Sequence, residues 1–188
     1  LLEQTLALLE KHYGTEHYEV AIALSSLGNV YEKLGIPVKQ KELLERTLAI
    51  QEKHYGTEHY QVAITLGSLS NAYGKLGNHK KEKELLEQAL AIKEKYYGIE
   101  HYDVAITLAN LGKTYGKLGD YQKKKELLER AIPLLEKHYG TEHYEVATTL
   151  GDLIDTYEKL SDSKKKSYKE LVLAIHEKVL NITEQMEH

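Results

Sequence analysis

One ten-residue string recurs at a constant interval along the chain. HYGTEHYEVA begins at His12, and HYGTEHYQVA, YYGIEHYDVA and HYGTEHYEVA begin at His54, Tyr96 and His138. Each copy therefore starts 42 residues after the previous one. A catalytic centre needs one constellation of side chains, whereas a fixed period of about 20 to 50 residues is typical of stacked repeats. The period predicts an array of similar units, each packed on its neighbours.

Each period is expected to fold into two helices. In the first full copy, apolar residues from Val20 to Leu34 recur three and four positions apart, which predicts a helix with one apolar face. In the second copy, a similar stripe from Leu85 to Ile92 predicts a second helix that ends before Gly98. Gly35 lies between the two helices, where a residue free to take positive φ is favoured. The residues expected to start the second helices are Pro37, Asn78, Asp120 and Asp162.

The recurring string is interpreted as the joint between one repeat and the next. Gly14 ends a second helix, and Glu19 lies in the first turn of the following helix, where the helix dipole favours an acid. Tyr13 and Tyr18 flank the turn and can bury their rings while the hydroxyl groups stay in water. The predicted segments are 1–13 as the second helix of an incomplete repeat, then repeats over 14–55, 56–97, 98–139 and 140–188, the last with a divergent C-terminal capping helix.

The overall composition excludes several classes of function. The chain has 25 Lys and Arg against 29 Asp and Glu, a net charge of -4, so it offers no general attraction to nucleic acid or anionic lipid. It has no Cys, and no apolar run is long enough to span a membrane. The predicted localisation is cytoplasmic. Because Leu1 aligns with Leu43, we expect the chain to begin inside a repeat and to be a fragment of a longer protein.

The chain carries no sequence signature of an enzyme or of a metal site. It contains no G-x-S-x-G motif, no glycine loop that would cradle a phosphate and no paired carboxylates in a catalytic setting. His12 and His17 are five residues apart with Gly14 between them, whereas a helical metal pair needs a spacing of three or four. The prediction is therefore a protein that is not an enzyme, with no catalytic residues, no metal and no cofactor.

Lysine runs open the second helices. Lys80 and Lys81 begin one run, and two later runs cover 123–125 and 164–166. They either form a basic stripe or belong to a solvated face in which acids such as Glu84 and Glu126 alternate with them. The second interpretation is favoured, because mixed charge on one helix face is typical of a surface in water.

The apolar and small residues of each period resemble the tetratricopeptide repeat. The pattern is L-x-x-L-[GS]-x-x-Y, with a small residue sixteen positions after the Tyr. It is carried by Leu24, Leu27, Gly28, Tyr31, Leu44 and Thr47, by Leu66, Leu69, Ser70, Tyr73, Leu86 and Ala89, and by Leu108, Leu111, Gly112, Tyr115, Leu128 and Ala131. The 42-residue period and the EH-x-[DEQ]-VA entry resemble the long variety found in kinesin light chains. The resemblance implies an all-α, right-handed α-solenoid of four antiparallel helix pairs, preceded by one orphan helix.

Two features depart from the family pattern. The family usually has a small Ala near the start of the second helix. The matching positions here are Gln40, Glu82, Lys124 and Lys166, whose long side chains we expect to lean outward. Pro133 replaces the Ala found at 49 and 91 inside the second helix, and we expect it to kink that helix because its ring removes a hydrogen bond.

The resemblance also implies where a partner would bind. In the family, the first helices line an inner face that receives an extended peptide or a partner helix, so we expect a non-catalytic protein-binding scaffold. The matching positions are Asn29, Lys33, Asn71, Lys75, Asn110, Lys113, Lys117, Asp155 and Lys159, with Ser25, Gly67, Ala109 and Gly151 beside them. Amides and cations can hold peptide backbone and acidic side chains. Gly67, Gly74, Gly116 and Gly151 are expected to leave this face bare in places.

Three alternatives to the scaffold stay open at this point. The array can self-assemble, it can serve as the sensor or regulatory arm of a larger multidomain signalling protein, or it can be a consensus-like stack without a ligand. The orphan helix at the start carries Leu2, Leu6 and Leu9 and has no first helix of its own in this chain. Its apolar stripe predicts weak self-association through this end.

Overall fold

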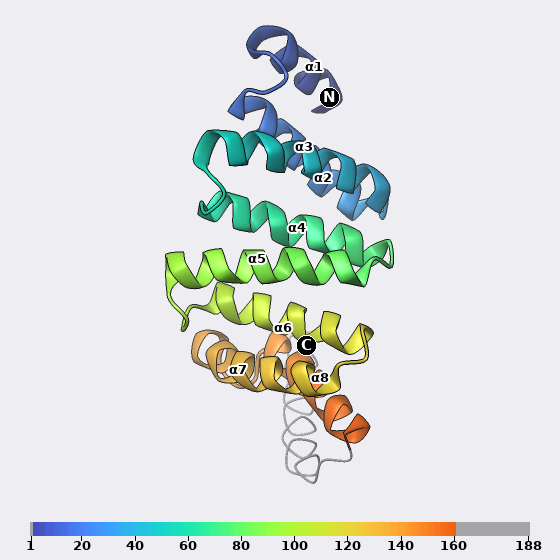
Figure 1. The fold of residues 1–188 in the computed structure, drawn as a ribbon, viewed down its shortest axis with the longest axis vertical. Helices are drawn as coiled ribbons and strands as arrows, with labels where there is room; N and C mark the ends of the chain where they lie inside the picture. The colour runs from blue at the N-terminus through green and yellow to red at the C-terminus, as the bar shows by residue number, and fades with distance from the viewer. Residues whose placement is uncertain (1, 161–188) are drawn as a thin grey trace, which may run out of the picture. The chain divides into compact units, whose positions relative to one another are not determined.

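The computed structural model describes residues 2–160, and every regular element in this range is an α-helix (Figure 1). The helices are α1 Leu2–Tyr13, α2 Tyr18–Lys33, α3 Pro37–Tyr55, α4 Tyr60–Lys75, α5 His79–Tyr97, α6 Tyr102–Lys117, α7 Tyr121–Tyr139 and α8 Tyr144–Lys159. They pack as tandem pairs, which confirms the predicted all-α repeat fold. The chain divides into two compact units, Leu1–Tyr96 and Tyr97–His188, which are described separately.

In the first unit, short turns make neighbouring helices antiparallel, and apolar stripes meet between them (Figure 1). One cluster joins Leu44 of α3 to Val62 and Leu66 of α4 and to Leu85 of α5. Leu6 and Leu9 of α1 contact a second cluster, which is built from Val20, Ala21, Leu24 and Ile50. Each fully buried aliphatic side chain contributes roughly 1.5–3 kcal/mol, so the helix-to-helix contacts hold this unit together.

No residue of α1 is buried, and Leu8 of this helix is 67% exposed. Leu2 is 38% exposed, while Leu6 and Leu9 are partly covered. The helix thus contacts the rest of the unit through one side. The self-association expected through α1 stays a prediction.

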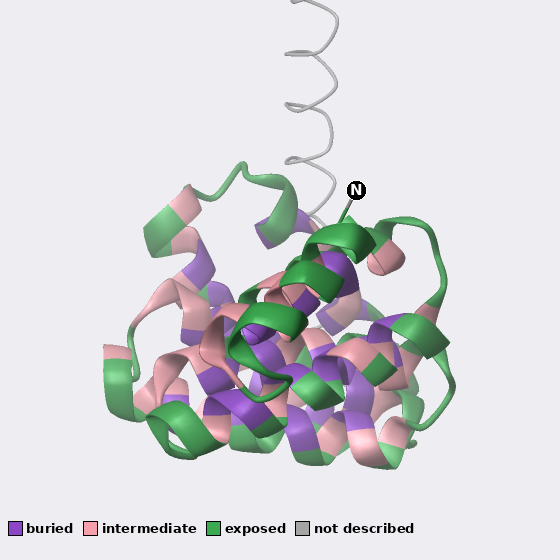
Figure 2. Ribbon diagram, turned by 90° about the horizontal axis from the view of Figure 1, so that it is seen from above, coloured by how far each residue is buried: buried purple, intermediate pink, exposed green. Residues whose placement is uncertain are grey.

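In the second unit, α7 packs against both α6 and α8. Leu108 of α6, Leu128 and Leu135 of α7, and Leu150 and Tyr157 of α8 are almost completely buried. Figure 2 shows that within each unit buried residues lie on the helix sides that face other helices, with exposed residues on the opposite sides. This is the arrangement that the three-and-four spacing of apolar residues predicts.

Pro133 lies inside α7 and is exposed. The helix continues past it to Tyr139 and has 19 residues, as α3 and α5 have. The proline therefore does not end the helix. The kink expected at this position stays a prediction.

The turn after each first helix follows one hydrogen-bonding scheme. Gly35 has a φ of 68°, and its N–H donates to the Glu32 carbonyl at 3.0 Å while the Ile36 N–H donates to the Tyr31 carbonyl at 2.9 Å. This pair of bonds closes the helix because it satisfies carbonyls that the last turn leaves unpaired. The predicted positive φ at this glycine is confirmed.

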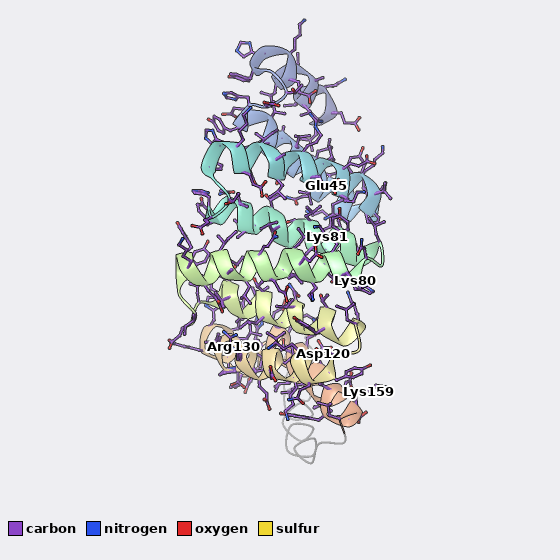
Figure 3. The ribbon with its side chains drawn as sticks, in the orientation of Figure 1. Glu45, Lys80, Lys81, Asp120, Arg130 and Lys159 are labelled. Carbon is purple, nitrogen blue, oxygen red and sulfur yellow. The ribbon has the colours of Figure 1, made fainter. Side chains whose placement is uncertain are left out.

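Two of the predicted caps at the start of the second helices are confirmed. Oδ1 of Asn78 accepts from the backbone N–H of Lys81 at 3.1 Å. Oδ1 of Asp120, labelled in Figure 3, accepts from the backbone N–H of Lys123 at 2.9 Å. In the first copy Ile36 makes no side-chain cap, and Pro37 takes the first position of α3 as expected.

The expectation that the long residues near the start of the second helices lean outward is wrong. Gln40 is 0% exposed, Glu82 is 7% exposed and Lys124 is 9% exposed. Gly74 and Gly116 explain two of these cases, because a Cβ at these glycines would lie 2.6 Å from Glu82 Oε1 and 2.8 Å from Lys124 Cδ. The missing side chain of each glycine leaves the space that the long residue fills. The expectation that Gly74 and Gly116 leave the surface bare is therefore wrong as well.

Several expectations lie outside the described residues. They concern the N-cap Asp162, the long side chain of Lys166, the lysine run at 164–166 and the divergent helix within 140–188. None of the described helices is both long and apolar enough to cross a membrane.

Candidate interaction surface

The histidines of the recurring string cap helices. His17 Nδ1 accepts from the backbone N–H of Glu19 at 3.3 Å, and His59 Nδ1 accepts from that of Gln61 at 3.3 Å. His101 and His143 make the equivalent bonds at 3.2 Å. Sequence reasoning missed this role because Ser, Thr, Asp and Asn are the usual N-caps. The available signal was the invariant place of this His immediately before each first helix.

Aromatic rings of the same string stack on one another within each unit. In the first unit, Tyr18 stacks on His54 with ring centroids 5.1 Å apart, and Tyr55 stacks on His59 at 4.4 Å. In the second unit, Tyr102 stacks on His138 at 4.0 Å. Among residues 2–160, no group of three or more His, Asp or Glu is placed to hold a metal ion. Capping and stacking thus account for the His and Tyr residues of the string.

Ion pairs also recur between the joint and the next second helix. Lys53 pairs with Glu16 and Lys95 with Glu58 in the first unit. In the second unit, Lys137 Nζ lies 3.0 Å from Glu100 Oε2. All of these side chains are about 70% exposed, so water screens each pair and it contributes little to stability.

The first helices of the first unit, α2 and α4, carry matching residues on one side, which are exposed except for the half-buried Ser68. Ile22, Ser26, Asn29 and Lys33 follow one side of α2, and Ile64, Ser68, Asn71 and Lys75 hold the equivalent places on α4. We call this set the first-helix face of the first unit, and the counterparts on α6 and α8 form the first-helix face of the second unit, which is described by itself. The four predicted binding residues of this unit, Asn29, Lys33, Asn71 and Lys75, are all exposed.

Glu32 connects the two helices of this face. Its Oε1 accepts a hydrogen bond from Asn71 Nδ2 at 2.6 Å and lies 3.6 Å from Lys75 Nζ. The structure thus brings Asn71 and Lys75 together around a carboxylate that sequence analysis did not include. Asn29 and Lys33 lie on the same face of α2.

In the second unit the predicted residues on α6 and α8 also reach the surface. Asn110, Lys117, Asp155 and Lys159 are exposed, and Lys113 is half-buried; Lys159 is labelled near the end of α8 in Figure 3. Ala109 was expected beside them, but it is 6% exposed and belongs to the core. Ser25, Gly67 and Gly151 are intermediate in exposure.

Asp152 is the centre of a charged group in the second unit. Its Oδ2 lies 3.4 Å from Lys113 Nζ, and its Oδ1 lies 3.7 Å from Lys124 Nζ. Lys124 belongs to α7, and its side chain passes the space left by Gly116. A second helix therefore supplies a cation to the first-helix face. Sequence reasoning missed this contribution, although the signal was present as a glycine eight positions before an unusually long residue.

A small cleft lies at the beginning of α2 and α4, where the first-helix face carries exposed isoleucines. Ile22 is 53% exposed and Ile64 is 48% exposed. The cleft has a volume of about 120 Å³ and is lined by Tyr18, Ala21, Ile22, Gln51, Tyr55 and Gln61. The face therefore has an apolar end at the helix starts and a cationic end at Lys33 and Lys75.

Comparisons with known proteins agree with this architecture. A tetratricopeptide repeat family model matches residues 41–95 and 83–137. A crystal structure of a putative kinesin light chain with nearly identical TPR-like repeats, from Podosopora anserina, is 29% identical, with a TM-score of 0.79 over 95% of this chain and 85% of that one.

Two further solved structures share the fold at lower identity. BtubC (BKLC) from P. vanneervenii is 21% identical, with a TM-score of 0.78 over 85% of this chain and 64% of that chain. The apo form of RapI is 19% identical, with a TM-score of 0.77 over 88% of this chain and 58% of that chain. A comparison with curated protein sequences found no match. The family match covers more than half of the chain, so the chain belongs to the tetratricopeptide repeat family.

Proposed function

We propose that the chain is a non-catalytic scaffold that binds an extended segment of a partner protein along the first-helix face. The observation that carries this proposal is the match between α2 and α4: Asn29 and Asn71, like Lys33 and Lys75, lie exposed at the same place in successive repeats. Apolar positions of the same helices are buried between helices, whereas Asn29 and Lys33 are exposed and Asn71 and Lys75 lie around Glu32. Tetratricopeptide repeats are generally protein-binding modules, which supports the same function.

The chemistry of this face suits a peptide with carboxylates. An Asn side chain can both donate to and accept from a peptide backbone, and Lys33 offers an exposed ammonium group. Around Asp152, two ammonium groups from Lys113 and Lys124 surround one carboxylate, so a positive charge is left over. Such a surplus attracts an acidic side chain and raises the association rate at low salt.

A pull-down with the intact chain tests this proposal. The test variant carries Lys33→Glu, Lys75→Glu and Lys117→Glu on the first-helix face. The matched control carries Lys53→Glu, Lys95→Glu and Lys137→Glu, which change the net charge equally at lysines of the second helices that pair with acids of the joints. We expect the native chain and the control to retain the same partner and the test variant to lose it.

Equal capture by all three proteins would contradict binding at this face. Loss of the partner from both variants would show that total charge, and not the first-helix face, controls binding. Thermal unfolding of each variant, followed by circular dichroism, verifies that it is folded before the comparison.

A further inference from the structure

The cleft between α2, α3 and α4 has the features of a specific anchor site. We propose that it binds one aliphatic side chain of the partner segment, a role that rests on the proposed function of the first-helix face. Tyr18, Ala21 and Ile22 come from α2, Gln51 and Tyr55 from α3, and Gln61 from α4. Two successive repeats thus build the site together.

The volume of the cleft selects the size of its occupant. Pockets for drug-sized molecules have about 300–1,000 Å³, so a cleft of about 120 Å³ holds too little of a free ligand to bind it. A cavity of about 150 Å³ accepts benzene, which makes this cleft suitable for Leu, Ile, Val or Met and too small for an indole. The occupant is therefore a side chain held in place by the polypeptide that carries it.

The apolar groups in the walls of the cleft are held in position before binding. Tyr18 stacks on His54, and Tyr55 stacks on His59, so neighbouring rings restrain both tyrosines. Ala21 is 2% exposed and packs in the core, whereas Ile22 is half exposed. An aliphatic side chain in the cleft would cover Ile22, which removes apolar surface from water without requiring a change in the protein.

Gln51 adds a polar requirement to this apolar cleft. The residue is 8% exposed, and its Oε1 accepts a hydrogen bond from Thr65 Oγ1 at 2.6 Å. Its side chain lines the cleft, where an amide N–H can donate to the backbone carbonyl beside a bound aliphatic side chain. The equivalent positions in the next repeats are Lys93 and Leu135, so this amide is particular to the joint between α2 and α4.

The probe for the test is a display library of random linear peptides, selected on the intact chain. We expect the selected peptides to share one aliphatic position. The test variant is Ile22→Glu, and the matched control is Val38→Glu, because Val38 is an aliphatic residue of α3 that is similarly exposed, at 50% against 53%, and lies outside the first-helix face and the cleft. For a selected peptide, Ile22→Glu should weaken binding at least about tenfold, or roughly 1.4 kcal/mol, and Val38→Glu by less than about twofold.

A direct readout does not depend on the variants. In the native chain, the side-chain amide signals of Gln51 in nuclear magnetic resonance spectra should shift when the selected peptide is added. Selected peptides without a common aliphatic residue, no selected peptide at all, equal effects of Ile22→Glu and Val38→Glu, or unmoved Gln51 signals would each overturn the anchor site.

The same experiment separates this inference from the proposed function. Peptides that lose binding with Lys33→Glu but not with Ile22→Glu would leave the first-helix face as the binding surface and overturn the cleft alone. Peptides whose binding is changed by neither substitution would overturn both the anchor site and the proposed function of the first-helix face.

Discussion

The hydroxyl group of Tyr73 in α4 donates a 2.5 Å hydrogen bond to Oε1 of Glu45 in α3. Tyr31 bonds to Glu3 in the same way at 2.8 Å, and Tyr157 bonds to Glu129 at 2.7 Å. In each case the two residues are 28 positions apart and join a first helix to the second helix before it. The repeats are therefore linked by a recurring charged hydrogen bond in addition to their apolar contacts.

Tyr73→Phe should lower the free energy of unfolding by about 1 kcal/mol, because it removes this bond while keeping the ring. Urea denaturation followed by circular dichroism measures the change. Tyr55→Phe is the control, since Tyr55 stacks on His59 and its hydroxyl bonds to none of the described residues. Equal losses in the two variants would contradict a stabilising role for the Glu45 bond.

The same hydrogen bond predicts a dependence on alkaline pH. The bond to Glu45, followed by burial, raises the pKa of Tyr73 from 10.0 to about 12. Because the folded state holds this proton more tightly, the contribution is fully present below pH 10 and is lost as the pH rises through about 12. The stability difference between the native chain and Tyr73→Phe should therefore shrink across this range. A difference that stays constant from pH 9 to pH 12 would contradict the prediction.

Pro133→Ala should stabilise the protein, because the proline lacks a backbone N–H and lies inside α7. Alanine is favoured over proline in a helix interior by about 3 kcal/mol, which sets the upper limit of the gain. Ala91→Pro makes the reverse change at the equivalent position of α5 and should destabilise. Thermal unfolding of the native chain and the two variants measures these changes in stability. A loss of stability in Pro133→Ala would show that the packing of α7 depends on its proline.

Gln40→Met should also stabilise the protein, by about 1–2 kcal/mol. Gln40 is completely buried, and neither its Nε2 nor its Oε1 has a hydrogen-bond partner. Methionine has a similar length and needs no partner, so it removes the cost of burying an amide. Gln40→Ala is the control for volume and should destabilise because it leaves a cavity. A destabilised Gln40→Met variant would indicate that the amide is satisfied in solution, for example by water.

His59→Ala should cost about 1 kcal/mol, since the helix loses the side chain that accepts from Gln61 N–H. His59→Asn restores an accepting group at the N-cap and should recover most of that loss, apart from the stacking on Tyr55. Chemical denaturation of the three proteins separates capping from stacking. If Asn were as destabilising as Ala, the ring and not the cap would explain why this position is His.

Local features of the fold could be predicted from the sequence because their causes are local. The spacing of Val20, Leu24 and Leu27 determines which side of α2 is buried, and Gly35 determines where the chain turns. Asn78 and Asp120 cap helices through bonds to residues three positions away. None of these features requires knowledge of which helix lies next to which.

Only the tertiary structure decided the contacts that shape the candidate binding surface. Glu32 accepts a hydrogen bond from Asn71, which lies 39 residues later in the chain. Asp152 forms ion pairs with Lys113 and Lys124, which belong to two other helices. The cleft, likewise, needs α2, α3 and α4 to be packed together before Gln51 can face its occupant. From the sequence alone, a charged residue such as Lys124 is expected to be exposed. It is buried here because the glycine opposite, Gly116, has no side chain to keep it out.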